Sequence, residues 1–215
     1  MTVCRWRFLG TMRYGEALAL QKDLVRRRVT GDIPDTLLFV EHPHVVTLGK
    51  MAKAEHLLAR RPDVEIIETD RGGDVTYHGP GQVVGYPIVD LSALKRDVKW
   101  YLEQLEEVMI RAAARYGVIA ARQPGMTGAW VGDAKLGAIG VRVEKWVASH
   151  GFALNANTDL SYFDLIIPCG LEGKRVTSLA KEVGRDVDLD ELRRSLAEVF
   201  GEVFGRTMVD ADEDR

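Results

Sequence analysis

The stretch RGGDVTYHGPGQVVGYP, residues 71–87, decides how the rest of this chain is interpreted, because five of its residues are glycines and two are prolines. Glycine allows close backbone approach, and proline removes an N–H donor, so an ordinary core strand rarely carries this density. One interpretation is a long hairpin with awkward turns. The other is a backbone wall that lies close against a ligand, with Tyr77 and His78 at its rim. We favour the wall, because most polar groups in the stretch have no evident structural role.

The composition is that of an ordinary globular protein. With 215 residues, 46% hydrophobic and 28% charged, the chain predicts one domain over residues 1–215, with a disordered tail from about residue 208. A net charge of −3 provides no basic field for nucleic acid. No apolar run reaches the ~20 residues that span a bilayer, so we expect no membrane partner. The N-terminus lacks an apolar signal core, and we expect a cytoplasmic location.

The cysteines and histidines give little support for a metal site. Cys4 and Cys169 are the two cysteines, so a disulfide framework and a CxxC metal site are excluded. His42 and His44 flank Pro43 and alternate as in a strand, but their neighbourhood offers too few further ligands. We therefore expect no metal, and Cys169 stands alone as a candidate nucleophile.

Hydrophobic periodicity predicts a mixed β-sheet flanked by helices, an α/β fold. Three helices are expected at 14–30, 97–116 and 189–204, with Gly31 ending the first, Asp97 capping the second and Gly117 ending it. A short helix is expected at 55–61. Strand-like segments lie at 36–42, 45–49, 64–69, 83–88, 118–122, 128–131, 135–146 and 149–155.

Cys169 lies in DLIIPCGLEGKR, residues 164–175, where an apolar strand-like run ends at Pro168 and Gly170 follows the cysteine. A lone buried cysteine is usually inert core. The flanking proline and glycine instead favour a thiol in a turn, within reach of backbone amides. Both interpretations are open on the sequence alone.

Lys135 is the candidate cation for such a thiol, since a reactive cysteine needs a neighbour that favours its thiolate. It opens KLGAIGVRV, a strand-like segment with small apolar residues, in which an unpaired lysine would be poorly solvated. The alternative is an exposed lysine at a strand end. A pair between Cys169 and Lys135 would explain both residues.

Two segments with small side chains, Ala138-Ile139-Gly140 and Gly151-Phe152-Ala153, form a further pattern. They predict a narrow apolar slot for a straight acyl chain, in which each buried methylene contributes ~0.8 kcal/mol; the alternative is that they ease strand packing. GPGQVVGY lacks the ending of a P-loop, and the glycines of 71–87 lack the GxGxxG spacing. Nucleotide binding therefore has no support, and no cofactor is expected.

Three blocks of the sequence resemble the octanoyltransferases of lipoate biosynthesis, the lipoyl(octanoyl) transferase family. They are RGGDVTYHGPGQVVGYP, KLGAIGVRVEKWVASHGFALN and IIPCGL, and they occur in the family's order. TLGKMAKAEHLL, residues 47–58, also resembles the family's N-terminal segment. The resemblance covers roughly residues 8–205, and it implies a mixed sheet flanked by helices like the catalytic domain of biotin and lipoate protein ligases.

The resemblance implies an acyltransferase that moves an octanoyl group from octanoyl-acyl-carrier protein to a lysine of a lipoyl domain. Acceptors would be the lipoyl domains of 2-oxoacid dehydrogenase complexes and the glycine cleavage H protein. Cys169 would carry the acyl group as a thioester, and Lys135 would lower its pKa and shuttle protons. Substrate contacts would come from Arg71, Gly72, Gly73, Asp74, Val75, Thr76, Tyr77, His78, Ala138, Ile139, Gly140, Gly151, Phe152 and Ala153.

Some roles stay open at this point. Backbone amides of residues 71–78 or 169–171 are candidates to stabilise the oxyanion. His78 either orients a reacting group or holds the loop by hydrogen bonding, and we favour the second role. Gly137 is expected to alter the slot slightly. Two other functions compete with the transferase: an ATP-dependent lipoate–protein ligase of the same fold, and a non-catalytic module that binds acyl groups or lipoyl domains.

Overall fold

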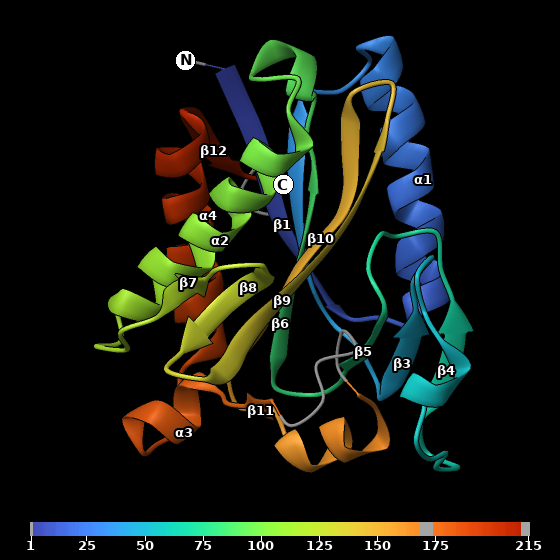
Figure 1. Ribbon diagram of the computed structural model, residues 1–215. Coiled ribbons are helices and arrows are strands. Elements are labelled where there is room, and N and C mark those ends of the chain that lie inside the picture. The colour runs from blue at the N-terminus through green and yellow to red at the C-terminus, as the bar shows by residue number, and fades with distance from the viewer. Residues whose placement is uncertain (1, 168–173, 212–215) are drawn as a thin grey trace.

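The computed structural model of the protein describes residues 2–167 and 174–211, in which a large and a small β-sheet pack with four α-helices (Figure 1). The helices are α1 (Tyr14–Thr30), α2 (Val98–Ala114), α3 (Leu179–Val183) and α4 (Leu189–Phe204). The large sheet holds β1 (Thr2–Thr11), β2 (Asp35–Glu41), β6 (Gln82–Ile88), β7 (Ala121–Gln123), β8 (Met126–Val131), β9 (Ala134–Glu144), β10 (Val147–Asn155), β11 (Arg175–Val176) and β12 (Arg206–Asp210). The small sheet holds β3 (Val45–Leu48), β4 (Glu65–Glu68) and β5 (Val75–His78).

The large sheet is mixed, as the sequence predicts. Its strand order is β12-β1-β2-β6-β10-β9-β8-β7, with β11 pairing β9 off this path. Pairing is parallel in β12-β1-β2 and between β11 and β9, and antiparallel from β2 to β7. In the small sheet, β3 pairs in parallel with β4 and antiparallel with β5. The expected α/β fold with a mixed sheet is confirmed.

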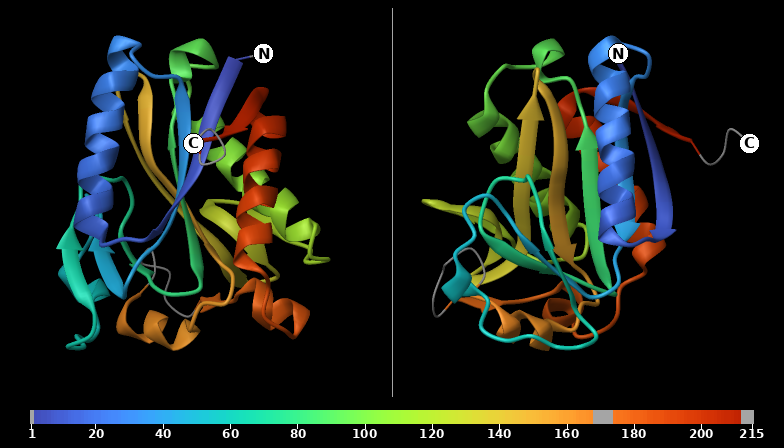
Figure 2. Two further views of the ribbon diagram at one scale, coloured as in Figure 1. Left: turned by 180° about the vertical axis from the view of Figure 1, so that it is seen from behind. Right: turned by 90° about the vertical axis from the view of Figure 1, so that its right-hand side faces the viewer.

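Helices cover both faces of the large sheet. Figure 2 shows α1 on one face, and α2 with α4 on the opposite face. Successive strand residues point to opposite faces of the sheet. Phe39 and Leu154 pack in the core beneath α2 and α4, while Val40 and Ala153 pack toward α1. The lower end of α1 lies beside the small sheet, which faces the α1 side of the large sheet (Figure 1).

The three long helices follow their sequence signals closely. α1 ends at Gly31, whose φ of 82° is a left-handed conformation that a glycine adopts without strain. The Asp97 side chain accepts a hydrogen bond from the N–H of Trp100 and caps α2. Asp188 caps α4 by accepting from the N–H groups of Asp190 and Glu191. The predicted boundaries at 14–30 and 189–204 are therefore confirmed.

The glycine-rich stretch is not a hairpin, because its two strands belong to different sheets. β5 pairs with β3 in the small sheet, whereas β6 lies between β2 and β10 in the large sheet. The chain turns between them at Gly81, which has a φ of 76°. A Cβ at Gly81 would lie 2.6 Å from the carbonyl oxygen of Asn157, so only glycine fits this crossing without a shift.

Several local predictions are wrong. Residues 55–61 form only a short 3₁₀ turn, Ala54–His56, followed by extended chain in which Leu57 makes a bridge with Ile166. In the strand-like run before Pro168, Leu165 ends a 3₁₀ turn, Leu160–Leu165, whereas Ile166 is extended and makes the bridge with Leu57, so the described part of the run forms a single bridge rather than a longer strand. Residues 118–120 precede β7 and lie outside any strand.

The tail is also more ordered than predicted. β12 pairs in parallel with β1 from Arg206 to Asp210, and the N–H of Ala211 donates to the carbonyl of Trp6. The expectation of disorder from residue 208 is therefore wrong through Ala211. In the described part of the chain, no helix combines the length and apolar character needed to cross a membrane.

Candidate active site

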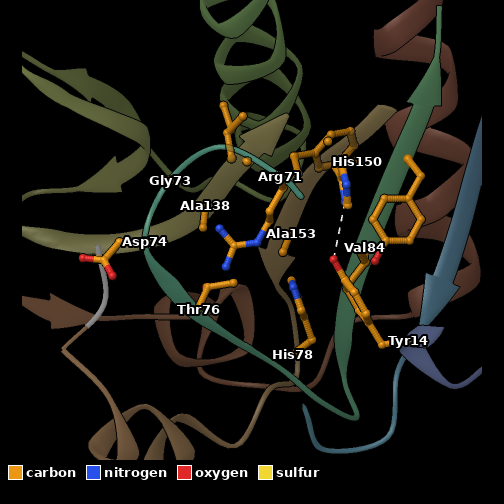
Figure 3. A pocket seen from close by; sticks show the side chains of 15 residues that line it. Tyr14, Arg71, Gly73, Asp74, Thr76, His78, Val84, Ala138, His150 and Ala153 are labelled. Atoms are coloured by element: carbon orange, nitrogen blue, oxygen red, sulfur yellow. Dashed lines mark hydrogen bonds between the residues drawn. The ribbon is translucent and has the colours of Figure 1, made fainter. Parts of the chain in front are cut away.

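A central cavity lies between the two sheets, with Tyr14, the first residue of α1, at one of its ends (Figure 3). Its walls combine the loop after β4, the β5 strand and the β9–β10 pair. The residues that line it are Tyr14, Arg71, Gly73, Asp74, Thr76, His78, Val84, Tyr86, Ala138, Ile139, Gly140, His150, Gly151, Phe152 and Ala153. The structure thus brings most of the contact residues predicted from the first two blocks, residues 71–78 and 138–153, to one place.

Strand alternation decides which residues of β5 face the central cavity. Thr76 and His78 line it, whereas Val75 and Tyr77 point to the opposite face and pack in the core of the small sheet. Tyr77 stacks on Tyr162 with ring centroids 5.2 Å apart. The structure therefore places Val75 and Tyr77, two of the predicted contact residues, outside the cavity.

Arg71 anchors the loop that forms one wall. Its guanidinium donates to the hydroxyl and the carbonyl of Thr47, the latter over 2.7 Å, and to the carbonyl of Gly72 over 3.0 Å. The N–H of Gly72 donates to the carbonyl of Val141, which ties the loop to β9. Gly72 itself lines an open groove outside the central cavity rather than the cavity. Arg71 therefore joins the small sheet to the wall of the cavity.

The β8–β9 pairing contains an irregularity next to the predicted cation. Ala129 pairs with Gly137, and the next residue, Trp130, pairs with Lys135. Leu136 is therefore an extra residue on β9. Such a bulge bends the strand and changes the direction of the side chains that precede it.

The bulge directs Lys135 toward the site. Leu136 is fully buried in the core beneath α2, and a Cβ on Gly137 would lie 2.5 Å from Sδ of Met109 on α2. Leu136 and Gly137 are consecutive residues, yet both face α2. The in-and-out alternation of side chains along β9 therefore shifts by one residue at this point. Lys135 comes to the face of Ala138, and both line a small second pocket, called here the Lys135 pocket. A side chain at position 137 would point at the helix, but Gly137 itself lines the Lys135 pocket, so its expected effect on the slot stays a prediction.

Lys135 is buried, with 6% of its surface exposed, so the alternative of an exposed strand-end lysine is excluded. Its Nζ lies 5.0 Å from the ring centroid of Trp130, a cation–π geometry. Its carbonyl accepts from the N–H of Thr177, just after β11. Val176 pairs with Lys135 and lines the same pocket. Cys169 lies outside the described residues.

Small residues on the β9–β10 pair leave room for the central cavity. Ala138 pairs with Ala153 and Gly140 with Gly151 across the two strands. A Cβ on Gly140 would lie 3.0 Å from Cδ of Arg71, so this glycine lets the loop approach the sheet closely.

His78 is held by a buried network. Its Nδ1 lies 2.7 Å from Oε1 of Gln82, whose amide nitrogen donates to the carbonyl of Tyr77 and to Oδ1 of Asn155. The Gln82 oxygen can only accept, so His78 donates from Nδ1 and Nε2 is its acceptor nitrogen. Burial, with the neighbouring His42, lowers the pKa of His78 to about 3, and the ring is neutral. These contacts fit the loop-holding role that we favoured for His78.

The sequence analysis missed the residues at the α1 end of the cavity. Tyr14 begins α1, and its hydroxyl lies 3.4 Å from Nδ1 of His150. Nε2 of His150 lies 2.9 Å from Oδ1 of Asp70. In a regular strand His150 would lie on the α2 face of the sheet, as Phe152 does. Its backbone instead has a left-handed φ of 55°, and its ring lies on the α1 face beside Tyr14. No sequence signal indicates this conformation, since the residue is not a glycine.

The paired histidines 42 and 44 serve structural roles. Nδ1 of His42 donates to the carbonyl of Met12 over 2.7 Å, and Nε2 accepts from the hydroxyl of Tyr86. Burial lowers the pKa of His42 to about 4. Among the described residues, no group of three or more histidine, cysteine or acidic side chains could hold a metal ion.

Some backbone donors proposed for the oxyanion are already engaged. The N–H of Gly72 binds the carbonyl of Val141, and that of Val75 binds Oδ1 of Asp74 over 2.8 Å. The amides of residues 169–171 lie outside the described residues. The open groove joins this region to the surface, and His56, Gly73, Lys135 and Ile139 line it. This open groove gives a route from the surface to Lys135, and we call it the entrance groove.

Comparison with protein families gives a match over residues 13–201 to the lipoyl protein ligase A/B catalytic domain. A protein from Rubrobacter xylanophilus named octanoyltransferase is 51% identical over 206 residues, covering 93% of this chain and 92% of that protein. An octanoyltransferase from Solibacter usitatus is 48% identical, covering 97% of this chain and 96% of the relative.

Solved structures share the fold at low sequence identity. A lipoate-protein ligase A bound with ATP superposes with a TM-score of 0.81 at 18% identity, covering 99% of this chain and 91% of the other. A bipartite lipoate protein ligase from Thermoplasma acidophilum, described with its E2 lipoyl domain, gives a TM-score of 0.71 at 16% identity, covering 100% and 90%. The expected likeness to lipoate protein ligases is confirmed at the level of the fold.

Proposed function

Because the chain belongs to the lipoyl protein ligase A/B catalytic-domain family and is an octanoyltransferase within it, we propose a ping-pong transfer through Cys169. Octanoyl-acyl-carrier protein is the donor, and a lysine of a lipoyl domain is the acceptor. The observation that carries the proposal is that the buried Lys135 lines both the entrance groove and the Lys135 pocket, which adjoins the central cavity.

The arrangement of the central cavity and the Lys135 pocket supports a reaction near Lys135 and binding of the acyl chain in the cavity. The central cavity and the Lys135 pocket share Thr76, Ala138 and Ala153, so they meet at the middle of the β9–β10 pair. An acyl group whose carbonyl lies near Lys135 therefore extends its chain along Ala138 and Ala153 toward α1. Each methylene buried there contributes ~0.8 kcal/mol, which binds the chain by shape without a charged group on it.

The neighbouring chain supports Cys169 as the acyl carrier. The N–H of Ile167 donates to the carbonyl of His56, which lines the entrance groove. After the segment that holds Cys169, Val176 pairs with Lys135. Both ends of that segment are therefore attached to walls of the site.

The proposed reaction uses Lys135 twice. In the first half, the Cys169 thiolate attacks the donor carbonyl, the bond to the carrier sulfur breaks, and the Lys135 ammonium gives a proton to that sulfur. In the second half, the acceptor amine attacks the acyl-enzyme and gives its proton to the neutral Lys135. The Cys169 thiolate leaves, and the ammonium is restored. Transfer between two thiols makes the first half nearly neutral in free energy.

The acceptor and the location complete the proposal. A similar structure is described with its E2 lipoyl domain, which supports a lipoyl domain as the acceptor for this fold. We propose that acceptors include the lipoyl domains of 2-oxoacid dehydrogenase complexes and the glycine cleavage H protein, and that the reaction takes place in the cytoplasm.

A transfer assay without ATP tests this function against the ligase alternative. Octanoyl-acyl-carrier protein and a lipoyl domain are mixed with the enzyme, and the intact mass of the domain is followed. One octanoyl group should appear on the domain lysine. Product formed only from free octanoate with ATP would show a ligase, and binding without product would show a non-catalytic module.

A further inference from the structure

We propose that Tyr14, backed by His150, forms the end wall of the central cavity and limits the length of the acyl chain that the enzyme transfers. The inference rests on the proposed function, in which an acyl chain occupies this cavity. It adds the residue that sets the chain length and places that residue on α1, away from the reacting atoms.

The position of the wall follows from the course of the cavity. The end shared with the Lys135 pocket is lined by Thr76, Ala138 and Ala153. In Figure 3, Ala138 lies toward one side of the cavity, with Tyr14 and His150 across from it. A straight chain with its carbonyl near Lys135 therefore ends against the Tyr14 ring.

Tyr14 is fixed in this position from several sides. It is 2% exposed, its ring stacks on that of His78 with centroids 6.0 Å apart, and it packs against His42 at 5.3 Å. Its hydroxyl lies within 3.4 Å of both Thr69 Oγ1 and His150 Nδ1. A ring held in this way does not move aside for extra methylenes without breaking those contacts, and overpacking a tight site is costly.

His150 makes the second layer of the wall. Its Nε2 is bound to Asp70, and its backbone N–H donates to Oε1 of Gln21 over 2.8 Å. Behind it lies an outer groove between α1 and the β9–β10 pair, lined by Gln21, Lys22, Asp70 and Arg142 among others. Among the described residues, His150 alone lines both the central cavity and this outer groove.

The consequence is selection by exclusion. The walls of the cavity are largely apolar, and burial favours every added methylene, so nothing in them prefers a short chain. A fixed barrier at the end is needed to reject longer chains. Removing the Tyr14 ring should open space in front of His150 and extend the cavity toward the outer groove.

The test compares acyl-chain profiles of Tyr14 variants. Octanoyl, decanoyl, dodecanoyl and tetradecanoyl carriers are supplied to the parent, Tyr14→Ala and Tyr14→Phe, and kcat/KM is measured for each. In Tyr14→Ala the dodecanoyl-to-octanoyl ratio should rise about tenfold or more, because several methylenes are then buried rather than excluded. Tyr14→Phe keeps the ring and loses the hydroxyl contacts, so its profile should stay that of the parent.

A control variant on α1 and a milder substitution of Tyr14 complete the test. Leu20→Ala removes a partly buried α1 side chain that packs near the cavity without lining it, and its profile should not change. If Tyr14→Ala does not fold, Tyr14→Leu should raise the decanoyl-to-octanoyl ratio.

Two failures can be told apart. A folded Tyr14→Ala or Tyr14→Leu that still transfers octanoyl with the parent's chain profile overturns the end-wall inference and leaves the proposed function intact. A parent protein that transfers no octanoyl group from the carrier overturns the proposed function itself.

Discussion

Lys135 shows how much a single residue decides in this site. Without the extra Leu136, the alternation of β9 would turn Lys135 toward α2 and its apolar core. The sequence indicated that this lysine is special because it opens a glycine-rich apolar segment. It could not indicate the direction of the side chain, because a bulge depends on how β8 pairs and leaves no mark in residues 134–138.

Substitutions at Lys135 separate its two proposed tasks. Arginine keeps the charge and is almost never deprotonated in proteins, whereas methionine loses both functions. Lys135→Met should slow alkylation of Cys169 by iodoacetamide near neutral pH, because less thiolate is present. Lys135→Arg should retain more of that reactivity yet accumulate acyl-enzyme in a single turnover, with deacylation slowed ~10²–10⁴-fold.

The rate of deacylation onto a lipoyl domain decides this prediction. If Lys135→Arg deacylates as fast as the parent enzyme, Lys135 is not the base. His78, His150 or a bound water would then be the remaining candidates. His78 would be substituted first, because its Nε2 carries no proton and can accept one from the acceptor amine.

A substitution at Gly140 tests whether this glycine shapes the wall of the central cavity. In Gly140→Val the new side chain would meet Cδ of Arg71 and the carbonyl of Gly72, both about 3 Å from its Cβ. Such overpacking typically costs ~1–3 kcal/mol, and octanoyl transfer should fall more than transfer of a shorter acyl group. Gly15→Val, at an exposed position with open space, is the matched control and should change neither rate. Equal losses for both chain lengths would mean that Gly140 only packs strands.

At the scale of elements, the long helices were the most predictable part of the fold. α1, α2 and α4 each carry an apolar stripe, and a capping residue marks at least one end of each: Gly31 for α1, Asp97 for α2, and Asp188 and Gly205 for α4. Most of their boundaries therefore follow from local sequence. Short segments were harder, because tertiary contacts decide them. The strand-like run before Pro168 shows this, because it follows a 3₁₀ turn, Leu160–Leu165, whose Tyr162 stacks on His44 at 4.0 Å, and only Ile166 makes a bridge.

The division of strands between two sheets was also beyond the sequence. β5 and β6 are separated by only a few residues, and a hairpin was the natural alternative. The crossing at Gly81 sends β6 into the large sheet, and the cavity forms between the separated strands. Residues from three blocks could be assigned to one site by resemblance, but the positions of Tyr14 and His150 required the folded chain.

At the scale of the whole molecule, a buried carboxylate ties distant parts of the chain together. Asp35 on β2 is fully buried and accepts hydrogen bonds from Nε of Arg28 at 2.8 Å and from Nε of Arg206 at 2.9 Å. Arg28 belongs to α1, and Arg206 begins β12. This cluster therefore connects the first helix, the second strand and the last strand.

Asp35→Ala should destabilise the protein by ~3–5 kcal/mol, because it leaves the buried Arg206 guanidinium without its carboxylate and leaves Arg28 only its longer contact to Asp90. The free energy of unfolding is measured by urea denaturation. Asp23→Ala, which breaks an exposed pair with Arg26, is the control and should cost no more than ~1 kcal/mol. Similar losses in the two variants would show that the buried cluster contributes no special stability.

The central claim is that Cys169 carries the acyl group, and intact-mass analysis of the acyl-enzyme tests it most directly. The protein is incubated with octanoyl-acyl-carrier protein, without acceptor or ATP, and the adduct is mapped by peptide. Cys4 provides the control, because it is fully buried and burial raises the pKa of its thiol. We predict one hydroxylamine-labile octanoyl group on Cys169, retained in Cys4→Ala and discharged onto a lipoyl domain when one is added. A hydroxylamine-labile thioester that persists in Cys169→Ser, for example on Cys4, would contradict the account.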